Sequence, residues 1–239
     1  ENYPGFEKIS GYELMGKMRK HAESLGVRIV NDTITKVDFE NQSKTLYGKK
    51  TYTAKAVIIA TGASAKWLGL ESEKKYRGHG VSACAVCDGF FYAGQTVAVV
   101  GGGNTALEDA QYLSNMCQKV YLIHRRSEFR ADKIEVDRVT ANPKIELVLN
   151  STVEEVLGDE QGNVNTIKVK NLLNSNINEL SISGLFVAIG HHPNTDIFKN
   201  IIPLDDEGYI TSGVPCKNIT TIRGVFAAGD VISGNTRQA

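Results

Sequence analysis

The sequence predicts an α/β fold made of two nested Rossmann-like, three-layer dinucleotide-binding domains, each with a small β-meander. One pattern occurs twice: short β-rich stretches followed by an apolar strand that ends in a glycine. The two apolar strands with their glycines are Val57–Gly62 and Leu185–Gly190. Between these repeats lies a complete strand–helix–strand unit of about 30 residues, the size of one βαβ unit. A single continuous doubly wound sheet is the alternative, but it has no good place for two meanders.

Length, charge and hydropathy narrow the possible functions. The 239 residues suffice for one large domain or two modest ones. Basic and acidic residues balance at 27 each, so charge gives no argument for a nucleic-acid or membrane partner. No apolar run approaches the ~20 residues of a membrane helix and no signal peptide precedes the first helix, so we expect a cytoplasmic protein. The chain begins at Glu1 without methionine, and we interpret it as a fragment.

The first expected element is a helix that begins after Ser10 and ends at Gly26. Ser10 and Glu13 form a capping-box pattern, and apolar residues recur on one helical face: Leu14, Met15, Met18, Ala22 and Leu25. Three strands are expected next, at Val27–Val30, Ile34–Phe39 and Ala56–Ala60. The third is an unbroken apolar run, which suits a strand buried on both faces.

A second set of elements surrounds a glycine-rich turn. The apolar strand Thr96–Val100 leads into the glycines, and a helix follows whose apolar face contains Ala106, Leu107, Ala110, Leu113 and Met116. Val120–Ile123 completes the strand–helix–strand unit. Further along, we expect a helix near Asp132–Thr140 and strands at 145–149, 153–157, 164–170, 185–189 and 225–228.

The glycine-rich turn fits a dinucleotide-binding site. Residues 101–106 match G-x-G-x-x-A directly after a predicted strand and at the start of a predicted helix. Gly101 allows the tight turn, Gly103 lets the backbone approach a pyrophosphate, and Ala106 keeps helix and strand close. A purely structural turn is the alternative. The motif alone is weak, but its position between strand and helix favours a nucleotide.

Basic residues at the end of the next strand indicate which dinucleotide binds. An NAD site needs a carboxylate about 20 residues past the glycines for the ribose hydroxyls. His124, Arg125 and Arg126 stand there instead, followed by Arg130. Guanidinium groups bind a 2′-phosphate through charge-assisted hydrogen bonds, whereas a carboxylate would repel it. The pattern therefore favours NADPH over a merely solvated basic loop.

The segment Cys84–Gly89, with the order Cys-Ala-Val-Cys-Asp-Gly, is a candidate redox centre just before the glycine-rich turn. Two intervening residues allow the cysteines to close a disulfide or to present a dithiol. Asp88 supplies a carboxyl group suited to moving a proton as a thiolate forms or leaves. Half of a zinc site is the alternative, but no second Cys-x-x-Cys exists and the histidines lack ligand spacing. Cys117 and Cys216 are expected to be inert thiols.

A third apolar strand ends in Gly229 and Asp230 at the start of another predicted helix. The carboxylate of Asp230 is able to accept hydrogen bonds from ribityl or ribose hydroxyls. It is equally suited to capping the helix, so the residue types alone leave both interpretations open.

Together these elements resemble the low-molecular-weight thioredoxin reductases of bacteria across the whole chain. The resemblance rests on Glu1–Gly5, Ala60–Ala63, Val81–Phe91, Val97–Asp109, Leu122–Arg130, Gly184–Thr195 and Gly224–Ala239. The order is itself specific, because this family places Cys-x-x-Cys-Asp-Gly immediately before the glycine loop of its NADPH domain. Related flavin disulfide reductases have these cysteines in the FAD domain.

The resemblance implies a two-domain subunit that binds FAD and NADPH and forms a homodimer when full length. Residues 1–65 and 191–239 would form the FAD domain, and residues 66–190 the inserted NADPH domain. Cys84 would attack the disulfide of thioredoxin, Cys87 would lie against the flavin, and Asp88 would donate and accept the proton. The family's FAD contacts map onto Asn2, Thr61, Gly62, Gly229, Asp230, Val231, Arg237, Gln238 and Ala239.

The same resemblance assigns the NADPH contacts. The pyrophosphate loop would be Gly101, Gly103, Asn104, Thr105 and Ala106, and the 2′-phosphate site His124, Arg125, Arg126 and Arg130. Gly190 and His191 would lie near the nicotinamide half. Electrons would pass from NADPH through FAD to the cysteine pair and then to thioredoxin. The NADPH domain would rotate about linkers near Ser64–Lys66 and Gly190–Pro193 during this cycle.

The chain also departs from the family pattern. The family's first βαβ unit should precede Glu1, and its flavin-covering helix should follow Ala239. We therefore expect this polypeptide alone to retain FAD poorly and to show little turnover. A flavin-dependent dithiol oxidase or a peroxiredoxin-system reductase of the same fold is an alternative, but the oxidase should lack the arginines. A non-enzymatic nucleotide-binding module is a third possibility, and it would not need Cys84, Cys87 and Asp88.

Overall fold

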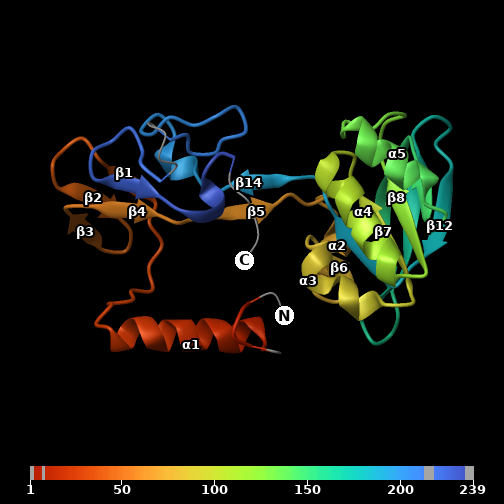
Figure 1. Cartoon of the computed structure of the whole chain (residues 1–239), viewed down its shortest axis with the longest axis horizontal. Helices are drawn as coiled ribbons and strands as arrows, with labels where there is room; N and C mark the ends of the chain where they lie inside the picture. The colour runs from red at the N-terminus through yellow and green to blue at the C-terminus, as the bar shows by residue number, and fades with distance from the viewer. Residues whose placement is uncertain (1–2, 7–8, 213–217, 235–239) are drawn as a thin grey trace. The chain divides into compact units, whose positions relative to one another are not determined.

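The structure, a computed structural model, describes residues 3–6, 9–212 and 218–234. The chain divides into two compact units, shown in Figure 1. Unit 1 consists of Glu1–Ala63 and Pro193–Ala239, and unit 2 consists of Ser64–His192. Unit 2 is thus inserted into the sequence of unit 1, and the boundaries expected after residues 65 and 190 lie two residues from these. No helix within the described ranges is long and apolar enough to span a membrane.

A five-stranded parallel sheet with the order β6-β13-β7-β8-β9 forms the middle layer of unit 2. Its strands are β6 (Val81–Ser82), β7 (Thr96–Val100), β8 (Lys119–Ile123), β9 (Ile145–Val148) and β13 (Gly184–Val187). Along β7, Val97 and Val99 join one core cluster while Ala98 and Val100 join another, as the alternation of a strand requires. Both faces of the sheet are covered, which explains the unbroken apolar runs in the sequence.

Helices cover one face of this sheet. They are α3 (Ala85–Asp88), the 3₁₀ helix η1 (Gly89–Tyr92), α4 (Asn104–Met116) and α5 (Lys133–Ala141). The helix α4 contacts β7 and β8, and α5 contacts β9. The expected apolar face of α4 is confirmed for its fully buried members, Ala106, Leu107, Ala110 and Leu113. Met116, at the end of the helix, packs only partly against the same cluster.

An antiparallel meander covers the opposite face. Its strands are β10 (Ser151–Gly158), β11 (Val164–Asn171) and β12 (Ile177–Ser181), and α2 (Glu71–Lys75) contacts β10. Val156, Ile167 and Val169 are buried here with residues of the sheet. The strand β12 was not expected, because its sequence is mostly polar and its residues are largely exposed.

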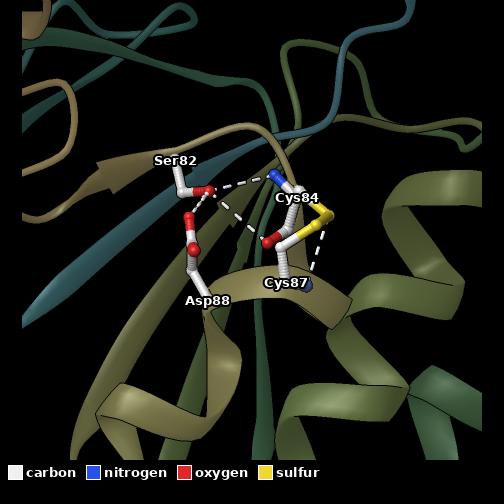
Figure 2. Close-up of a disulfide and its surroundings, with 4 residues drawn as sticks. All are labelled: Ser82, Cys84, Cys87 and Asp88. Carbon is white, nitrogen blue, oxygen red and sulfur yellow. Dashed lines mark hydrogen bonds between the residues drawn. A yellow bond between two sulfur atoms is a disulfide. The ribbon is translucent and has the colours of Figure 1, made fainter. Parts of the chain in front are cut away.

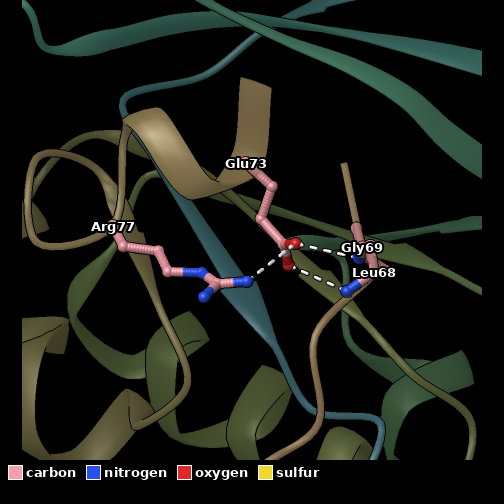
Figure 3. A network of polar contacts seen from close by, with 4 residues as sticks. All are labelled: Leu68, Gly69, Glu73 and Arg77. Carbon is pink, nitrogen blue, oxygen red and sulfur yellow. Dashed lines mark hydrogen bonds and ion pairs between the residues drawn. The ribbon is translucent and has the colours of Figure 1, made fainter. Parts of the chain in front are cut away.

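A buried carboxylate anchors the segment that enters unit 2 (Figure 3). Glu73 of α2 has no exposed surface. Its two oxygens accept the backbone N–H groups of Leu68 at 2.9 Å and Gly69 at 3.1 Å, and Arg77 Nη2 lies 3.3 Å from the second oxygen. The Arg77 guanidinium also stacks on Trp67, 4.0 Å from the ring centroid. These donors explain how a charged group is accommodated in the interior.

Unit 1 contains α1 (Gly11–Ser24), a three-stranded meander and a parallel pair of strands. The meander is β1 (Lys36–Asp38), β2 (Lys44–Tyr47) and β3 (Thr51–Ala54), and the pair is β4 (Val57–Ile59) with β15 (Val225–Ala227). Two 3₁₀ turns, η2 (Asp196–Phe198) and η3 (Gly229–Val231), complete the unit. Its core contains Val37, Phe39, Ile59, Ile210 and Val225.

Unit 1 corrects three expectations. The helix α1 begins as predicted, with the N–H of Glu13 donating to Ser10 Oγ at 3.2 Å, but none of its residues is buried. No strand forms at 27–30, where the apolar side chains are at least 40% exposed. The strand β4 is buried on one face only, since Ile58 is 69% exposed. Within the described residues β4 pairs with β15 alone, and the core of unit 1 lies on the side of Ile59.

The two connections between the units pair with each other. They are β5 (Ala63–Ala65) and β14 (His191–Pro193), which form a two-stranded sheet. The N–H of Lys66 donates to the carbonyl of Gly190 at 2.9 Å. The Thr61 hydroxyl donates to the Asn194 carbonyl at 2.8 Å, and the Asn194 side chain donates to the Thr61 carbonyl at 2.8 Å. Hydrogen bonds therefore join the outgoing and returning chain.

Candidate functional site

The cysteine pair of unit 2 forms a disulfide at the start of α3, as Figure 2 shows. The Cys84–Cys87 bond has an S–S distance of 2.09 Å and a Cα–Cα distance of 5.3 Å. Cys84 is half-buried and Cys87 is exposed, and the N–H of Cys87 donates to Cys84 Sγ at 3.2 Å. The two sulfurs are bonded to each other, and no three potential metal ligands gather anywhere in the described part of the chain.

A serine that the sequence did not single out connects the parts of this centre. The hydroxyl of Ser82, the last residue of β6, donates to Asp88 Oδ2 at 2.5 Å and accepts the N–H of Cys84 at 3.0 Å. Asp88 is the last residue of α3. Figure 2 shows the Asp88 carboxyl turned toward Ser82. The only signal in the sequence was a hydroxyl residue two positions before the first cysteine.

The remaining cysteines are separate from this centre. Cys117 is free and buried at the end of α4, where its thiol donates to the carbonyl of Tyr92 at 3.4 Å. Burial raises the pKa of the Cys117 thiol, which keeps it in the unreactive protonated form, as expected. Cys216 lies outside the described residues.

The glycine-rich turn places each of its glycines in a different environment. A Cβ on Gly101 would come within 2.4 Å of the Ala188 carbonyl oxygen, so the tight turn requires this glycine. A Cβ on Gly102 would meet the ring of His124. No atom lies within 4 Å of the Cβ position of Gly103, where the helix α4 begins. The backbone of Gly103 is therefore open to approach.

The start of α4 suits a pyrophosphate. Gly103 occupies the N-cap without a side-chain cap hydrogen bond, and no acidic residue lies in the first turn. Asn104 and Thr105 are exposed, while Ala106 is buried against β7. Free N–H groups at a helix N-terminus attract anions, so these residues fit the phosphates of a dinucleotide.

The arginine segment lies beside this loop. The N–H of Arg130 donates to the carbonyl of Gly102 at 2.8 Å. The Asn104 side chain donates to Asp132 Oδ2 at 2.8 Å, and the N–H of Asp132 donates back to Asn104 Oδ1 at 2.7 Å. Arg125, Arg126 and Arg130 are exposed. The structure thus brings the predicted phosphate residues of the two segments together.

His124 differs from the arginines with which it was grouped. It is 7% exposed, its ring stacks on Phe129 at a centroid distance of 5.3 Å, and its Nε2 lies 3.1 Å from the Glu128 carbonyl oxygen. Burial, assisted by the nearby arginines, lowers the pKa of His124. The structure places this ring in a buried position against Gly102 of the glycine loop, whereas the three arginines are exposed.

Four of the predicted FAD residues follow the carboxyl ends of the two parallel strands of unit 1. Ala228 donates its N–H to the Ile59 carbonyl at 2.8 Å, so the parallel strands β4 and β15 end together. The exposed residues Thr61 and Asp230 therefore follow neighbouring strand ends, a common place for nucleotides. Gly62 and Gly229 lie next to them, both with positive φ angles.

Other predicted contacts are placed differently. Val231 is fully buried in the core of unit 1. Gly190, three residues after the end of β13, is exposed with a φ of 100°, and His191 is half-buried. Four predicted FAD residues lie outside the described ranges: Asn2, Arg237, Gln238 and Ala239.

Comparison with known proteins identifies the family of this chain. The sequence model of the family described as "Pyridine nucleotide-disulphide oxidoreductase" matches residues 2–239. The thioredoxin reductase of Rickettsia typhi is 46% identical over 244 residues, which cover 100% of this chain and 78% of that protein. The thioredoxin reductase of Vibrio cholerae is 49% identical over 247 residues, with 100% and 77% covered.

Solved structures give the same result. The crystal structure of thioredoxin reductase from Streptococcus pyogenes matches with a TM-score of 0.88 and 38% identity, over 100% of this chain and 77% of that one. Thioredoxin reductase from Giardia duodenalis matches with a TM-score of 0.88 and 37% identity, over 100% and 78%. The chain belongs to the pyridine nucleotide-disulphide oxidoreductase family, and within it to the thioredoxin reductases. The expected α/β class with Rossmann-like units is thereby confirmed.

Proposed function

We propose that this chain acts in the NADPH-dependent reduction of the thioredoxin disulfide, with FAD as the intermediate carrier and Cys84 and Cys87 as the redox pair. One observation supports this most strongly. The disulfide lies in the same compact unit as the glycine-rich loop and the arginine segment. The relatives that match the whole chain bear the name thioredoxin reductase.

The cofactor assignments follow from the residues that suit each group. The start of α4, with Gly101, Gly103, Asn104 and Thr105, would hold the pyrophosphate of NADPH, and the three exposed arginines its 2′-phosphate. Gly190 and His191 would lie near its nicotinamide. The segments that follow the carboxyl ends of β4 and β15 would hold FAD through Thr61, Gly62, Gly229 and Asp230. When bound, NADPH and FAD supply the two electrons that open the disulfide.

The reduced cysteine pair then performs the exchange. The Cys84 thiolate would attack thioredoxin, so that a new S–S bond forms while the thioredoxin disulfide breaks and its leaving sulfur takes a proton. The Cys87 thiolate would attack Cys84 Sγ, restore the internal disulfide and release the second thioredoxin thiol. Asp88, the next residue after Cys87, would accept and return the proton in these steps.

The arginine segment favours a reductase over a dithiol oxidase of the same fold. An enzyme that passes electrons from a dithiol to oxygen has no need of a 2′-phosphate site. Here Arg125, Arg126 and Arg130 are all exposed beside the glycine loop. Three solvated guanidinium groups next to an uncapped helix start form a strongly anion-binding surface.

A two-part experiment tests the proposal. Any NADPH oxidation that the purified protein shows when supplied with FAD should depend on oxidised thioredoxin, and Cys84→Ser and Cys87→Ser should abolish it. In the second part, the cysteine pair is reduced chemically, the reductant is removed, and thioredoxin is added. New thiols should appear on thioredoxin without any cofactor. A reduced protein that leaves thioredoxin oxidised would overturn the assigned substrate, and NADPH oxidation indifferent to thioredoxin would indicate another acceptor.

A further inference from the structure

We propose that Ser82 is a positioning residue for thiol–disulfide exchange, acting by holding the Asp88 carboxyl beside the cysteine pair. This inference rests on the function proposed above. The Ser82 side chain is 9% exposed, and its Oγ lies between two parts of the redox segment. It contacts Asp88 Oδ2 at 2.5 Å and the backbone N of Cys84 at 3.0 Å (Figure 2).

The hydrogen of the Ser82 hydroxyl has one preferred acceptor. Asp88 Oδ2 at 2.5 Å competes only with the Cys84 carbonyl oxygen at 3.4 Å, and the shorter contact to the carboxyl is the stronger hydrogen bond. A lone pair of Oγ remains to accept the N–H of Cys84. The serine therefore donates to the carboxyl and accepts from the segment that begins α3, which fixes both ends of that helix.

Ser82 is suited to this task because it belongs to the sheet. It pairs with Phe186 of β13 in the parallel sheet of unit 2. The helix α3, in contrast, has only four residues and contains both Cys87 and Asp88. Such a short helix has little stability of its own. The hydroxyl of Ser82 thus ties a weak element to a rigid one at the residue that moves the proton.

The role follows from the proton balance of the exchange. When the reduced protein attacks thioredoxin, the proton of the Cys84 thiol passes to the Asp88 carboxylate, and the leaving thioredoxin sulfur takes a proton back. Ser82 neither gains nor loses a proton in this sequence. The hydrogen bond from Ser82 fixes the orientation of the Asp88 carboxyl, and proton transfer requires the accepting group to be held in a defined position.

Tyr92 also interacts with Asp88. Tyr92 of η1 is half-buried, and its ring meets Phe186 edge-on at a centroid distance of 5.5 Å. Burial raises the pKa of the Tyr92 phenol, and the charge of Asp88 adds to the rise. Tyr92 therefore stays neutral near neutral pH, so it does not accept the proton of the exchange.

The test uses the chemically reduced full chain and oxidised thioredoxin in single-turnover mixing, so that no cofactor is needed. Ser82→Thr and Ser82→Val have nearly the same shape and differ in the hydroxyl. We expect the Val variant to exchange about tenfold more slowly at saturating thioredoxin, with the half-saturating concentration unchanged, and the Thr variant to remain close to the unmodified protein. The pH–rate profile should change in the Val variant only, because the step affected is the proton transfer at Asp88.

Two controls separate this proposal from the one on which it rests. Ser183→Ala, a serine of unit 2 outside this cluster, should leave the rate and the pH profile unchanged. In an Asp88→Asn background the difference between Ser82→Thr and Ser82→Val should disappear, because the serine acts through the carboxyl. Equal rates and pH profiles for Thr and Val would refute the role of Ser82. An unmodified protein that fails to reduce thioredoxin at all would instead refute the proposed function.

Discussion

The imidazole of His124 lies directly on the backbone of Gly102. A Cβ built on this glycine would come within 2.1 Å of His124 Cε1 and 2.2 Å of Nδ1. The ring is held there by its stacking on Phe129 and by the contact of Nε2 with the Glu128 carbonyl. Position 102 therefore needs a glycine, because His124, which directly follows β8, occupies the space that a side chain there would fill.

Gly102→Ala should destabilise unit 2. The added methyl group must displace the buried His124 ring, and overpacking of this kind costs ~1–3 kcal/mol of unfolding free energy. Urea denaturation followed by circular dichroism measures the change. If the variant proves as stable as the unmodified protein, the ring is able to move away at no cost and the contact is not structurally important.

Gly103→Ala should show the opposite behaviour. No protein atom lies within 4 Å of the Cβ position, and the residue has an ordinary φ of −101°. Unfolding free energy should therefore change by less than ~0.5 kcal/mol. NADPH affinity should fall about tenfold, ~1.4 kcal/mol, because the methyl group occupies the space above the helix start. Fluorescence titration with NADPH, run beside Gly102→Ala, separates the two effects.

Arg125→Gln, Arg126→Gln and Arg130→Gln should each weaken NADPH binding and leave NADH binding unchanged. The loss of one charge-assisted hydrogen bond to the 2′-phosphate corresponds to ~1.5–3 kcal/mol. The matched control is Arg138→Gln on α5, an arginine that is 58% exposed and pairs with Glu135. Parallel titrations with the two coenzymes give the comparison. Equal losses for NADPH and NADH would argue against a 2′-phosphate site.

The two cysteines should behave differently once one is removed. The test uses a thioredoxin variant whose one remaining active-site cysteine is activated as a disulfide with thionitrobenzoate. If Cys84 attacks thioredoxin, Cys87→Ser should form a stable mixed disulfide and release thionitrobenzoate, because no neighbouring thiol is left on either protein to break the new bond. Cys84→Ser should form none. Non-reducing electrophoresis shows the complex directly. The reverse result would assign the attack to Cys87, which is the more exposed residue of the pair.

Asp109→Asn should stabilise the protein at neutral pH. Burial, with a smaller effect of Glu108, raises the pKa of Asp109 from 3.8 to about 6, so the folded state holds this proton more tightly than the unfolded chain. The penalty for ionising it is absent below about pH 4, grows as the pH rises, and is complete above about pH 6. The asparagine variant should gain about 2 kcal/mol there and nothing in acid. Asp137→Asn, the same change at an exposed position of α5, is the control for both pH ranges.

Glu73→Ala should cost ~3–5 kcal/mol, because it leaves the half-buried Arg77 side chain without its carboxylate and two backbone N–H groups without an acceptor. Glu71→Ala, at an exposed position of the same helix, should cost less than ~0.5 kcal/mol. Thermal unfolding of both variants makes the comparison. Similar midpoints would mean that the buried network contributes no net stability.

The sequence predicted the central part of unit 2 well. Apolar runs identified β7 and β8, and the helical spacing of Leu107, Ala110 and Leu113 identified the buried face of α4. These elements are covered on all core-facing sides, so their composition reports their burial. The predictions of a strand at Val27–Val30 and of burial on both faces at Ile58 failed, because apolar composition does not reveal whether another element covers a face.

Single polar residues were harder to assign. Glu73 lies in the charged run Glu-Ser-Glu-Lys-Lys, where nothing distinguishes the buried carboxylate from the exposed ones. The role of Ser82 depends on its contacts with Asp88 and Cys84, which exist only because β6 and α3 pack together. His124 was grouped with the arginines by its position, but its orientation depends on the space that Gly102 leaves. Such roles depend on contacts between distant segments, which spacing along the chain does not encode.

The pairing of β5 with β14 also affects how easily unit 2 could be transferred to another protein, in evolution or by engineering. The chain enters unit 2 (residues 64–192) through β5 and leaves it through β14, and these two strands are hydrogen-bonded to each other. If this cassette, residues 64–192, were inserted into another protein, its two ends would lie next to each other, so no long linker would be needed at the insertion site. Joining its own ends would need only a short peptide, so circular versions of the cassette are accessible as well.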